Sequence, residues 1–338
     1  MTNGHMETGM TGCQSPAGVL TSGAGSAASR ESRCIVCTGP LDESVSELFD
    51  TRFGIDGRYE ARHCSRCGLE QLFPVPDPAQ IKQLYESYYN FGGERGTLYM
   101  ALREWFFSSV LYRLWVRLDG DTSFHTPTGR GRLLDIGCNE GRGLTIYARN
   151  GFQVEGLELN ETAAAVARER GFTVSTHALD DFIPAIPYDV AVLSNVLEHS
   201  LDPKAMLLSV RRVLKPGGQV WISCPNSRSW LRSLFGLSWI NWHVPFHIAH
   251  FSSQSLRHLL TDTGFIQVEV RQTTPALWVG SSIIARIFAR RGTPTRQLRN
   301  PFLIVGLLLL ARFVFFPLLC LGNWLGRGDC LVSVARQA

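Results

Sequence analysis

The sequence predicts an α/β fold: a Rossmann-like, seven-stranded, mostly parallel sheet with helices on both of its faces. Between residues 132 and 270, short apolar runs alternate with segments of helical periodicity, which is typical of a parallel sheet covered on both sides. The first apolar run leads directly into a turn of small residues, as in folds that bind a ligand at the carboxyl ends of their strands. The length of 338 residues is enough to bury such a core.

The individual elements follow from the residues at their boundaries. Gly171 and Gly264 end two of the helices, and Pro203 begins a third, which Pro216 and the glycines after it terminate. After about residue 272 the alternation breaks, and one more apolar run supplies a final strand. The expected strands are 132–136, 154–157, 172–175, 190–193, 220–224, 265–270 and 330–335, and the expected helices among them are 143–150, 161–170, 203–214 and 253–263.

Two further helices are expected upstream of the sheet, at 77–89 and at 98–118. Residues 1–30 are mostly small and polar, so they lack the apolar side chains that would offset the entropy lost on ordering. The expected organisation is a disordered tail at 1–30, a cysteine-bearing module at 31–76, a helical linker or cap at 77–128, a core at 129–272, a basic and apolar insertion at 273–327, and the last core strand at 328–338.

A ligand site is expected at the turn that follows the first strand, at residues 135–141. Small residues let the backbone approach a ligand, and the next helix points its free N–H groups at it. Glu158 ends the following strand, where a carboxylate can accept hydrogen bonds from both hydroxyls of a ribose. Asn139 stands where a dinucleotide-binding turn has its second glycine, and a ligand without phosphates tolerates that residue better.

Four segments in this order resemble the class I S-adenosylmethionine-dependent methyltransferases: the turn at 135–141, Glu158, the run 188–199 and the Leu-Lys-Pro-Gly-Gly sequence at 214–218. The resemblance covers about residues 130–272 and the last strand. It implies a Rossmann-like fold, S-adenosylmethionine as the cofactor and methyl transfer as the activity. Asn139 departs from the general pattern as the sugar C-methyltransferase subgroup does, and that subgroup also carries a cysteine module in front.

The resemblance also assigns residues to parts of the cofactor. Asp135 faces the methionine portion and Asn195 lies near its end, while Glu158 holds the ribose. The turn is lined by Gly137, Cys138 and Gly141, and Leu179 and Asp180 lie beside the adenine.

Two C-x-x-C pairs, Cys34 with Cys37 and Cys64 with Cys67, are separated by 26 residues. Four thiolates on two tight turns satisfy a tetrahedral Zn²⁺ ion, whereas a redox role needs only one pair. The chain has nine cysteines, and the remaining five are scattered, so we expect free thiols in a reducing compartment rather than a disulfide framework. The segment from residue 64 to residue 76 resembles the zinc-ribbon head of bacterial methyltransferases found with cell-surface glycan genes, which implies a structural zinc site.

Three histidines are candidates for the base that removes a proton from the acceptor. His247 is the first candidate and His250 the second, because the family carries a similar Pro-x-His-x-x-His-Phe-Ser segment in its acceptor pocket. His199, which follows Glu198 after the fourth strand, is the third. The alternative is that these side chains only hold the loop in place through backbone contacts. An Asn/Asp-Pro-Pro-aromatic segment, which cradles exocyclic amines in nucleobase methyltransferases, is absent after Asn195, and this weighs against base methylation.

The run 302–321 is apolar apart from Arg312 and is preceded by a cluster of arginines. Its length fits a bilayer span, but a single crossing would leave the last strand on the wrong side of the membrane. We therefore expect a re-entrant hairpin, with Arg312 reaching the interface, or a helix lying in the membrane plane. The alternatives are a lid over an apolar pocket, a dimer face and a buried core helix.

The function predicted from these features is O-methylation of a saccharide or lipid-linked small molecule at the inner face of the cell membrane. The first 30 residues contain no basic segment followed by an apolar one, so a cytoplasmic protein is expected. A net charge of +4 is too small to favour a nucleic-acid partner. Two alternatives stay open: a non-catalytic, zinc-bearing membrane adaptor with a methyltransferase fold, and an RNA or protein methyltransferase.

Overall fold

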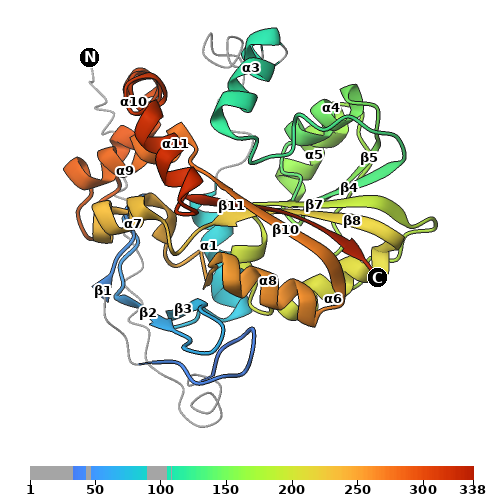
Figure 1. Ribbon diagram of the computed structural model, residues 1–338, viewed down its shortest axis with the longest axis horizontal. Coiled ribbons are helices and arrows are strands. Elements are labelled where there is room, and N and C mark those ends of the chain that lie inside the picture. The colour runs from blue at the N-terminus through green and yellow to red at the C-terminus, as the bar shows by residue number, and fades with distance from the viewer. Residues whose placement is uncertain (1–32, 43–46, 90–104, 108) are drawn as a thin grey trace, which may run out of the picture. The chain divides into compact units, whose positions relative to one another are not determined.

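A seven-stranded sheet runs through the segment Cys34–Ala338 in the computed structural model of the protein (Figure 1). The structure describes residues 33–42, 47–89, 105–107 and 109–338, and the expected tail at 1–30 lies outside them. The strand order is β10-β11-β8-β7-β4-β5-β6. The strands are β4 (Arg132–Ile136), β5 (Gln153–Leu157), β6 (Val174–Ser175), β7 (Tyr188–Ser194), β8 (Leu214–Pro225), β10 (Phe265–Thr273) and β11 (Cys330–Gln337).

The pairing of these strands confirms the predicted fold class. β4 pairs in parallel with β5 and β7, and β5–β6 and β7–β8 are parallel as well. β11 inserts between β8 and β10 and is antiparallel to both. The last strand therefore returns to the sheet, as the apolar run at 330–335 predicts.

Helices cover both faces of the sheet. On one side lie α4 (Arg142–Arg149) and α5 (Glu161–Glu169), and on the other α6 (Pro203–Val213) and α8 (Ser253–Asp262) (Figure 1). Asp202 caps α6 by accepting from the Ala205 N–H, and Pro203 follows in the first turn, where its missing N–H costs no hydrogen bond. Buried residues of α6 and α8 pack against the sheet strands in one core cluster, and those of α4 and α5 in others.

The helix expected at 98–118 is not continuous. α3 spans only Val110–Asp119, because the Ser109 side chain accepts a hydrogen bond from the Tyr112 N–H and starts a new helix there. Gly120, at a φ of 92°, ends it. Residues 105–107 are helical, whereas 98–104 lie outside the described residues. The helix at 77–89 is confirmed as α1 (Pro78–Tyr88), with Asp77 as its capping residue.

The cysteine-bearing module contributes three short strands, β1 (Glu47–Leu48), β2 (Tyr59–His63) and β3 (Glu70–Phe73). A fourth strand, β9 (Ala249–His250), comes from the segment between β8 and α8 and completes this sheet in the order β1-β2-β3-β9. The module is therefore hydrogen-bonded to the loop that carries two of the candidate histidines.

The insertion before the last strand is helical. It contains α9 (Ala276–Phe288), which the sequence does not predict, followed by α10 (Pro301–Phe313) and α11 (Phe316–Trp324). No single described helix has the length and hydropathy of a membrane span, although α10 and α11, bent by 65° at their junction, meet those criteria as a pair. Arg312 does not reach outward from this pair. Its side chain is buried, forms an ion pair with the partly buried Asp119 of α3 and donates to the Thr274 carbonyl (3.1 Å), and these partners offset part of the cost of removing the cation from water.

Candidate functional site

The turn predicted to hold the ligand lies at the carboxyl end of β4. Gly137, Asn139 and Gly141 have φ angles of 73°, 50° and 75°, a left-handed conformation that glycine adopts without steric cost. The N–H groups of Gly137 and Cys138 donate to the Leu157 carbonyl and tie the turn to the end of β5. A Cβ atom at Gly141 would lie 2.8 Å from the Cβ of Ala167 in α5, so a larger residue would push the turn away from that helix.

Two carboxylates border this turn, one buried and one partly buried. Asp135, in β4, is 6% exposed, and burial raises its pKa to about 7, with a further contribution from the charge of Glu158. Glu158 follows β5 and accepts from the N–H groups of Asn139 (2.9 Å) and Asn160 (2.8 Å). Burial raises the pKa of Glu158 as well. Because each oxygen of Glu158 keeps a second lone pair, this carboxylate can accept from the two hydroxyls of a ribose, and the carboxylate pair suits a cationic ligand such as S-adenosylmethionine.

The other predicted cofactor residues surround this edge in different ways. The Cys138 side chain packs into the core formed with α5, so only its backbone faces the turn. Leu179 packs partly buried against the main core, and Asp180 accepts a hydrogen bond from Ser209 of α6. Asn195 follows β7 in a left-handed conformation (φ 56°), with its N–H donated to the Ser223 carbonyl.

The candidate histidines gather at the end of the neighbouring strand β7. Glu198 and His199 lie on a short 3-10 helix, Leu197–His199, which the loop carrying His247 covers. The ring centroids of His199 and His247 are 4.6 Å apart, and His247 Nε2 lies 4.0 Å from Glu198 Oε1. The backbone N–H of Ile248 donates to the Glu198 carbonyl (2.8 Å) and fixes the two segments together. The structure thus brings His199 and His247 together with a carboxylate.

His250 stands apart from this pair. It belongs to β9, its ring packs 5.0 Å from that of Trp242, and neither of its ring nitrogens has a hydrogen-bond partner among the described residues. Burial lowers the pKa of His250 to about 3, and the charge of Arg232 adds to this effect. Burial also lowers the pKa of His199 to about 4 and that of His247 well below its usual value. All three imidazoles are therefore neutral at neutral pH.

Aromatic side chains that the sequence analysis did not single out pack next to the histidines. The Tyr85 hydroxyl lies 3.0 Å from Nδ1 of His199, and the Tyr89 hydroxyl lies 3.3 Å from Nε2 of His243. Phe246 packs edge-on against both tyrosines. The tyrosines are four residues apart on and just after α1, and this helical spacing in an aromatic-rich segment is the signal that could have indicated a shared face.

The four cysteines of the C-x-x-C pairs meet in one cluster. Cys34 Sγ lies 3.6 Å from Cys67 Sγ, and Cys37 Sγ lies 3.5 Å from Cys64 Sγ. All four sulfurs lie within 4.8 Å of one another. Four sulfurs bound to a tetrahedral zinc ion at about 2.3 Å are separated by about 3.8 Å, so the cluster has the dimensions of such a site.

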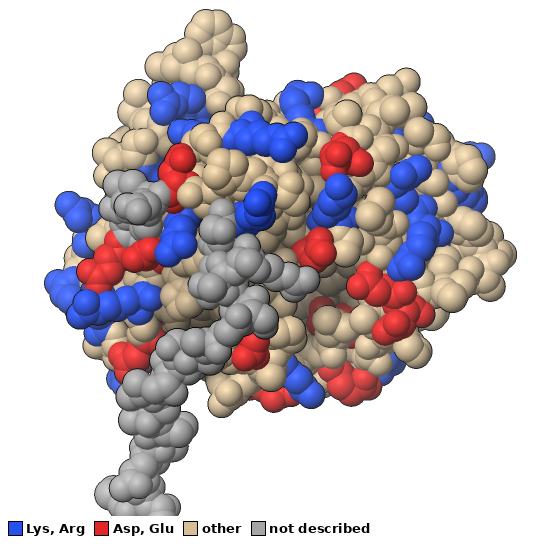
Figure 2. Space-filling model, turned by 90° about the horizontal axis from the view of Figure 1, so that it is seen from below, with Lys and Arg blue, Asp and Glu red and all other residues tan. Residues whose placement is uncertain are grey.

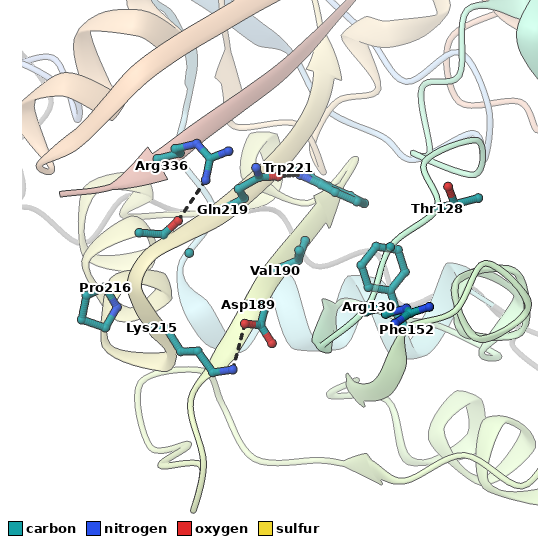
Figure 3. Close-up of a pocket in the computed structure, with 13 residues that line it drawn as sticks. Thr128, Arg130, Phe152, Asp189, Val190, Lys215, Pro216, Gln219, Trp221 and Arg336 are labelled. Atoms are coloured by element: carbon teal, nitrogen blue, oxygen red, sulfur yellow. Dashed lines mark hydrogen bonds and ion pairs between the residues drawn. The ribbon is translucent and has the colours of Figure 1, made fainter.

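A cavity of about 360 Å³ lies at the opposite edge of the sheet (Figure 3). It is lined by residues at the amino-terminal ends of β7 and β8, among them Asp189 and Lys215, whose side chains are 2.8 Å apart. Arg336, near the end of the antiparallel β11, also lines it. Ligands of open parallel sheets bind at the carboxyl ends of the strands, so this cavity lies at the edge opposite the predicted cofactor site.

Comparisons with known proteins point to the same domain. Residues 117–270 match the family model of a methyltransferase domain. Ubiquinone biosynthesis O-methyltransferase of Erwinia tasmaniensis is 36% identical over 127 residues, which are 34% of this chain and 51% of that protein. The same enzyme of Sodalis glossinidius is 33% identical over 123 residues, 33% of this chain and 49% of that protein. The chain thus spans about half the length of the curated relatives it matches.

Solved structures also match part of this chain. The crystal structure of a possible histamine N-methyltransferase from Thermotoga maritima has a TM-score of 0.44 and 17% identity, and the similarity covers 71% of this chain and 96% of that one. The matched segment, residues 117–270, contains β4 to β8, the carboxylate pair and the histidine-bearing end of β7. The chain therefore carries a class I S-adenosylmethionine-dependent methyltransferase domain.

Proposed function

We propose that the protein transfers the methyl group of S-adenosylmethionine to a hydroxyl group of a small-molecule acceptor. The observation that supports this most strongly is the pair of Asp135, which is buried, and Glu158, which is partly buried, beside the left-handed turn and within the matched domain. The relatives are named O-methyltransferases, which favours oxygen as the accepting atom. The cofactor supplies an activated methyl group, and the chain has to bind it, align the acceptor and manage the acceptor's proton.

The reaction is an in-line displacement at the methyl carbon. The bond between sulfur and the methyl carbon breaks while the oxygen–carbon bond forms, so the sulfonium becomes a neutral thioether and the hydroxyl proton is released. Holding the two partners in line contributes up to about 7–11 kcal/mol to lowering the barrier. Activation of the hydroxyl adds typically about 10²–10⁴-fold. We assign this activation to Glu198, His199 and His247, because they lie at the strand end next to the cofactor edge.

The aromatic side chains beside the histidines favour an acceptor with an apolar or ring-shaped body. The ring of Tyr85 packs against His199, and the rings of Tyr89 and Phe246 pack against each other and against Tyr85. Such walls stack on the faces of sugar rings and on aromatic or isoprenoid groups alike. We therefore propose a saccharide or a lipid-linked small molecule as the acceptor. A quinone precursor is the second candidate, because the relatives are named for ubiquinone biosynthesis.

A membrane surface is the proposed source of this acceptor. Many large apolar side chains of α10, α11 and the junction between them are exposed, and α3 adds others. Phe302, Phe313 and Trp324 are 88%, 67% and 81% exposed. Exposed apolar side chains of this size and number are typical of a protein that inserts partly into one leaflet. We propose that the protein acts in the cytoplasm at the inner face of the membrane.

Zinc is the proposed occupant of the cysteine cluster, with a structural role. Four cysteine ligands leave no open coordination position for chemistry. The purified protein is expected to hold one zinc ion per chain in this cluster, and Cys64→Ser is expected to release it and lower the melting temperature. Full retention of zinc and an unchanged melting curve in that variant would refute the assignment. Calorimetry with S-adenosylmethionine is the control that the core is still folded.

The two alternatives make different predictions. A non-catalytic adaptor would bind acceptor lipid or a partner without turnover, and an RNA methyltransferase would need a basic face. On the face seen in Figure 2, Lys and Arg are interspersed with Asp and Glu, which disfavours the RNA alternative. The deciding experiment incubates the protein and methyl-labelled S-adenosylmethionine with lipid and glycan extracts from cells that lack the gene. Label is expected in an organic-soluble or saccharide product, whereas label in RNA or in no product would contradict the proposal.

A further inference from the structure

Glu198 is a buried carboxylate without a partner. It is 1% exposed, and neither of its oxygens accepts a hydrogen bond from any residue that the structure describes. No Lys or Arg in the described ranges forms an ion pair with it, and its nearest basic atom is Nε2 of His247, at 4.0 Å. A protonated carboxyl would still lack an acceptor for its O–H. A buried group of this kind requires a counter-charge or a donor, so something beyond the described residues completes the site.

The two histidines beside Glu198 both present an Nε2 lone pair, and Nε2 of His247 also lies 3.3 Å from Nδ1 of His243. Nδ1 of His247 lies 2.9 Å from the Asn241 carbonyl, and Nδ1 of His199 lies 3.0 Å from the Phe246 carbonyl. A carbonyl only accepts, so Nδ1 carries the proton in each ring and Nε2 keeps its lone pair. A histidine that binds a metal usually donates its other N–H to a backbone carbonyl in this way, because that bond fixes both the tautomer and the orientation of the ring.

Glu198, His199 and His247 each offer one ligand atom, and these atoms lie within 4.8 Å of one another. Ligands of a zinc-like ion at about 2.0–2.2 Å are separated by about 3.4 Å, so small side-chain rotations would close the set around an ion. Two imidazoles and one carboxylate suit Zn²⁺, Mn²⁺ or Fe²⁺ better than Mg²⁺, which prefers oxygen. We propose that these three residues bind one divalent transition-metal ion, distinct from any ion in the cysteine cluster.

Such a site has a use in the reaction, and this part of the inference rests on the proposed function. Three protein ligands leave coordination positions open, as in catalytic rather than structural metal sites. A cation there would polarise the acceptor hydroxyl, lower its pKa and favour loss of its proton to water before the oxygen takes the methyl group. His247 would then be a ligand and not a free base.

Cobalt is a suitable probe, because its spectrum distinguishes the two clusters. Protein whose cysteine cluster already holds zinc is titrated with Co²⁺ alone, without cofactor or acceptor. We expect one additional Co²⁺ per chain, with visible d–d bands and without the near-ultraviolet charge-transfer bands that thiolate ligands produce. Glu198→Gln and His247→Gln are each expected to weaken this binding at least tenfold, because each removes one of three ligands.

His250→Gln is the matched control, since it replaces a buried histidine of the same loop whose ring is outside the ligand set. It is expected to keep the cobalt site. Calorimetric binding of S-adenosylmethionine verifies the fold of each variant and tests the proposed function separately. The inference is overturned if the wild type binds no Co²⁺ beyond the cysteine cluster, if the new bands show thiolate ligation, or if Glu198→Gln binds Co²⁺ as tightly as the wild type.

Discussion

At the scale of single residues, the cofactor edge depends on the carboxylates of Asp135 and Glu158. Burial disfavours the ionised form of both carboxylates. For Glu158, hydrogen bonds from the N–H groups of Asn139 and Asn160 partly offset this effect. The sulfonium and ammonium groups of S-adenosylmethionine are cations, and a cation near a buried carboxylate stabilises its ionised form. In the proposed complex, the ligand would therefore offset the cost of burying these carboxylates.

Replacing Glu158 by Ala is expected to weaken the binding of S-adenosylmethionine strongly. The variant loses two hydrogen bonds from ribose hydroxyls to a charged acceptor, each contributing about 1.5–3 kcal/mol. Isothermal titration calorimetry measures the loss, which should be at least a hundredfold in Kd. Glu161→Gln, which changes an exposed carboxylate in the first turn of α5, serves as the control and should bind normally. An unaltered Kd for Glu158→Ala would exclude a ribose contact.

The affinity for S-adenosylmethionine is also expected to depend on pH through Asp135. Its pKa is raised to about 7 in the free protein, so the carboxyl is neutral below that pH and ionised above it. A cationic ligand binds the ionised form better, and affinity should therefore rise with pH, by up to about tenfold per unit below pH 7. Calorimetry between about pH 5.5 and 7.5 avoids titration of the ligand's amino group, whose pKa is about 7.7–8.0. Asp135→Asn should bind weakly and without this slope, and the same slope in that variant would assign the titration to another group.

The positions of some of these residues in the fold follow from the sequence, and those of others do not. Asp135 and Glu158 are predictable because each comes at the end of an apolar strand, and parallel strands bring their carboxyl ends to one edge. The carboxylate of Asp180 is less predictable, since it accepts from Ser209 of α6, a contact that depends on how the helix packs. Tyr85 reaches His199 from a helix 114 residues earlier in the chain, and no local pattern encodes that meeting.

At the scale of elements, the ion pair between Arg312 and Asp119 connects α10 to α3. Arg312 is 3% exposed and also donates to the Thr274 carbonyl, while Asp119 accepts from the Ala276 N–H at the start of α9. Three helices therefore meet at one pair of buried charges. Gly280 in α9 lets α10 approach closely, because a Cβ atom there would lie 3.1 Å from that of Leu307.

Arg312→Met is expected to destabilise the protein by about 3–5 kcal/mol, because it leaves the carboxylate of Asp119 buried without its counter-charge. Denaturant unfolding measures the change. Arg299→Met, which removes an exposed arginine from the same insertion, should have little effect. The double variant Arg312→Met, Asp119→Leu should recover most of the lost stability, since no unpaired charge remains. A single variant as stable as the wild type would show that the pair contributes nothing.

The elements that the sequence predicts correctly are those with one clear period and clear ends. Strands β4 and β7 are short apolar runs, and α6 begins at Pro203 after its capping residue. The helix expected at 98–118 is interrupted because the polar Ser109, which the sequence alone does not distinguish from a residue on a helix surface, caps the N-terminus of α3. α9 is apolar over most of its surface and carries Gly280 and Ser282, so neither periodicity nor propensity indicates it. Packing against α10 compensates for its weak local preference.

At the scale of the whole molecule, the described residues comprise a methyltransferase domain and two additions. One is the cysteine-bearing module, which pairs with a loop of the domain, and the other is the apolar helical pair, α10 and α11, before the last strand. The module shares strand β9 with the loop of His247, and the helical pair contacts the core through the Asp119–Arg312 pair. The module therefore connects to the loop of the candidate histidines, and the helical pair to α3. This arrangement agrees with a domain in which cofactor binding is common to many enzymes and acceptor choice is specific.

Membrane binding is expected to depend on the exposed side chains of α10 and α11. The double variant Phe302→Glu, Trp324→Glu places two charges on that surface and removes apolar area that would be buried in lipid at about 25 cal/mol per Å². Co-sedimentation with anionic vesicles should fall at least tenfold, while calorimetric binding of S-adenosylmethionine stays unchanged. Leu208→Glu, on the exposed face of α6, is the control and should still sediment. Equal sedimentation of the double variant would show that another surface contacts lipid.

The measurement that tests the central claim most directly is a crystal structure of the protein grown with S-adenosylhomocysteine, the product of methyl transfer. We predict that the ligand lies at the carboxyl ends of β4 and β5, with its ribose hydroxyls on Glu158 and its amino-acid portion near Asp135. Ligand found instead in the cavity beside Lys215 and Arg336, at the opposite edge of the sheet, would contradict the assignment of the cofactor site, and so would crystals with no bound ligand at saturating concentration.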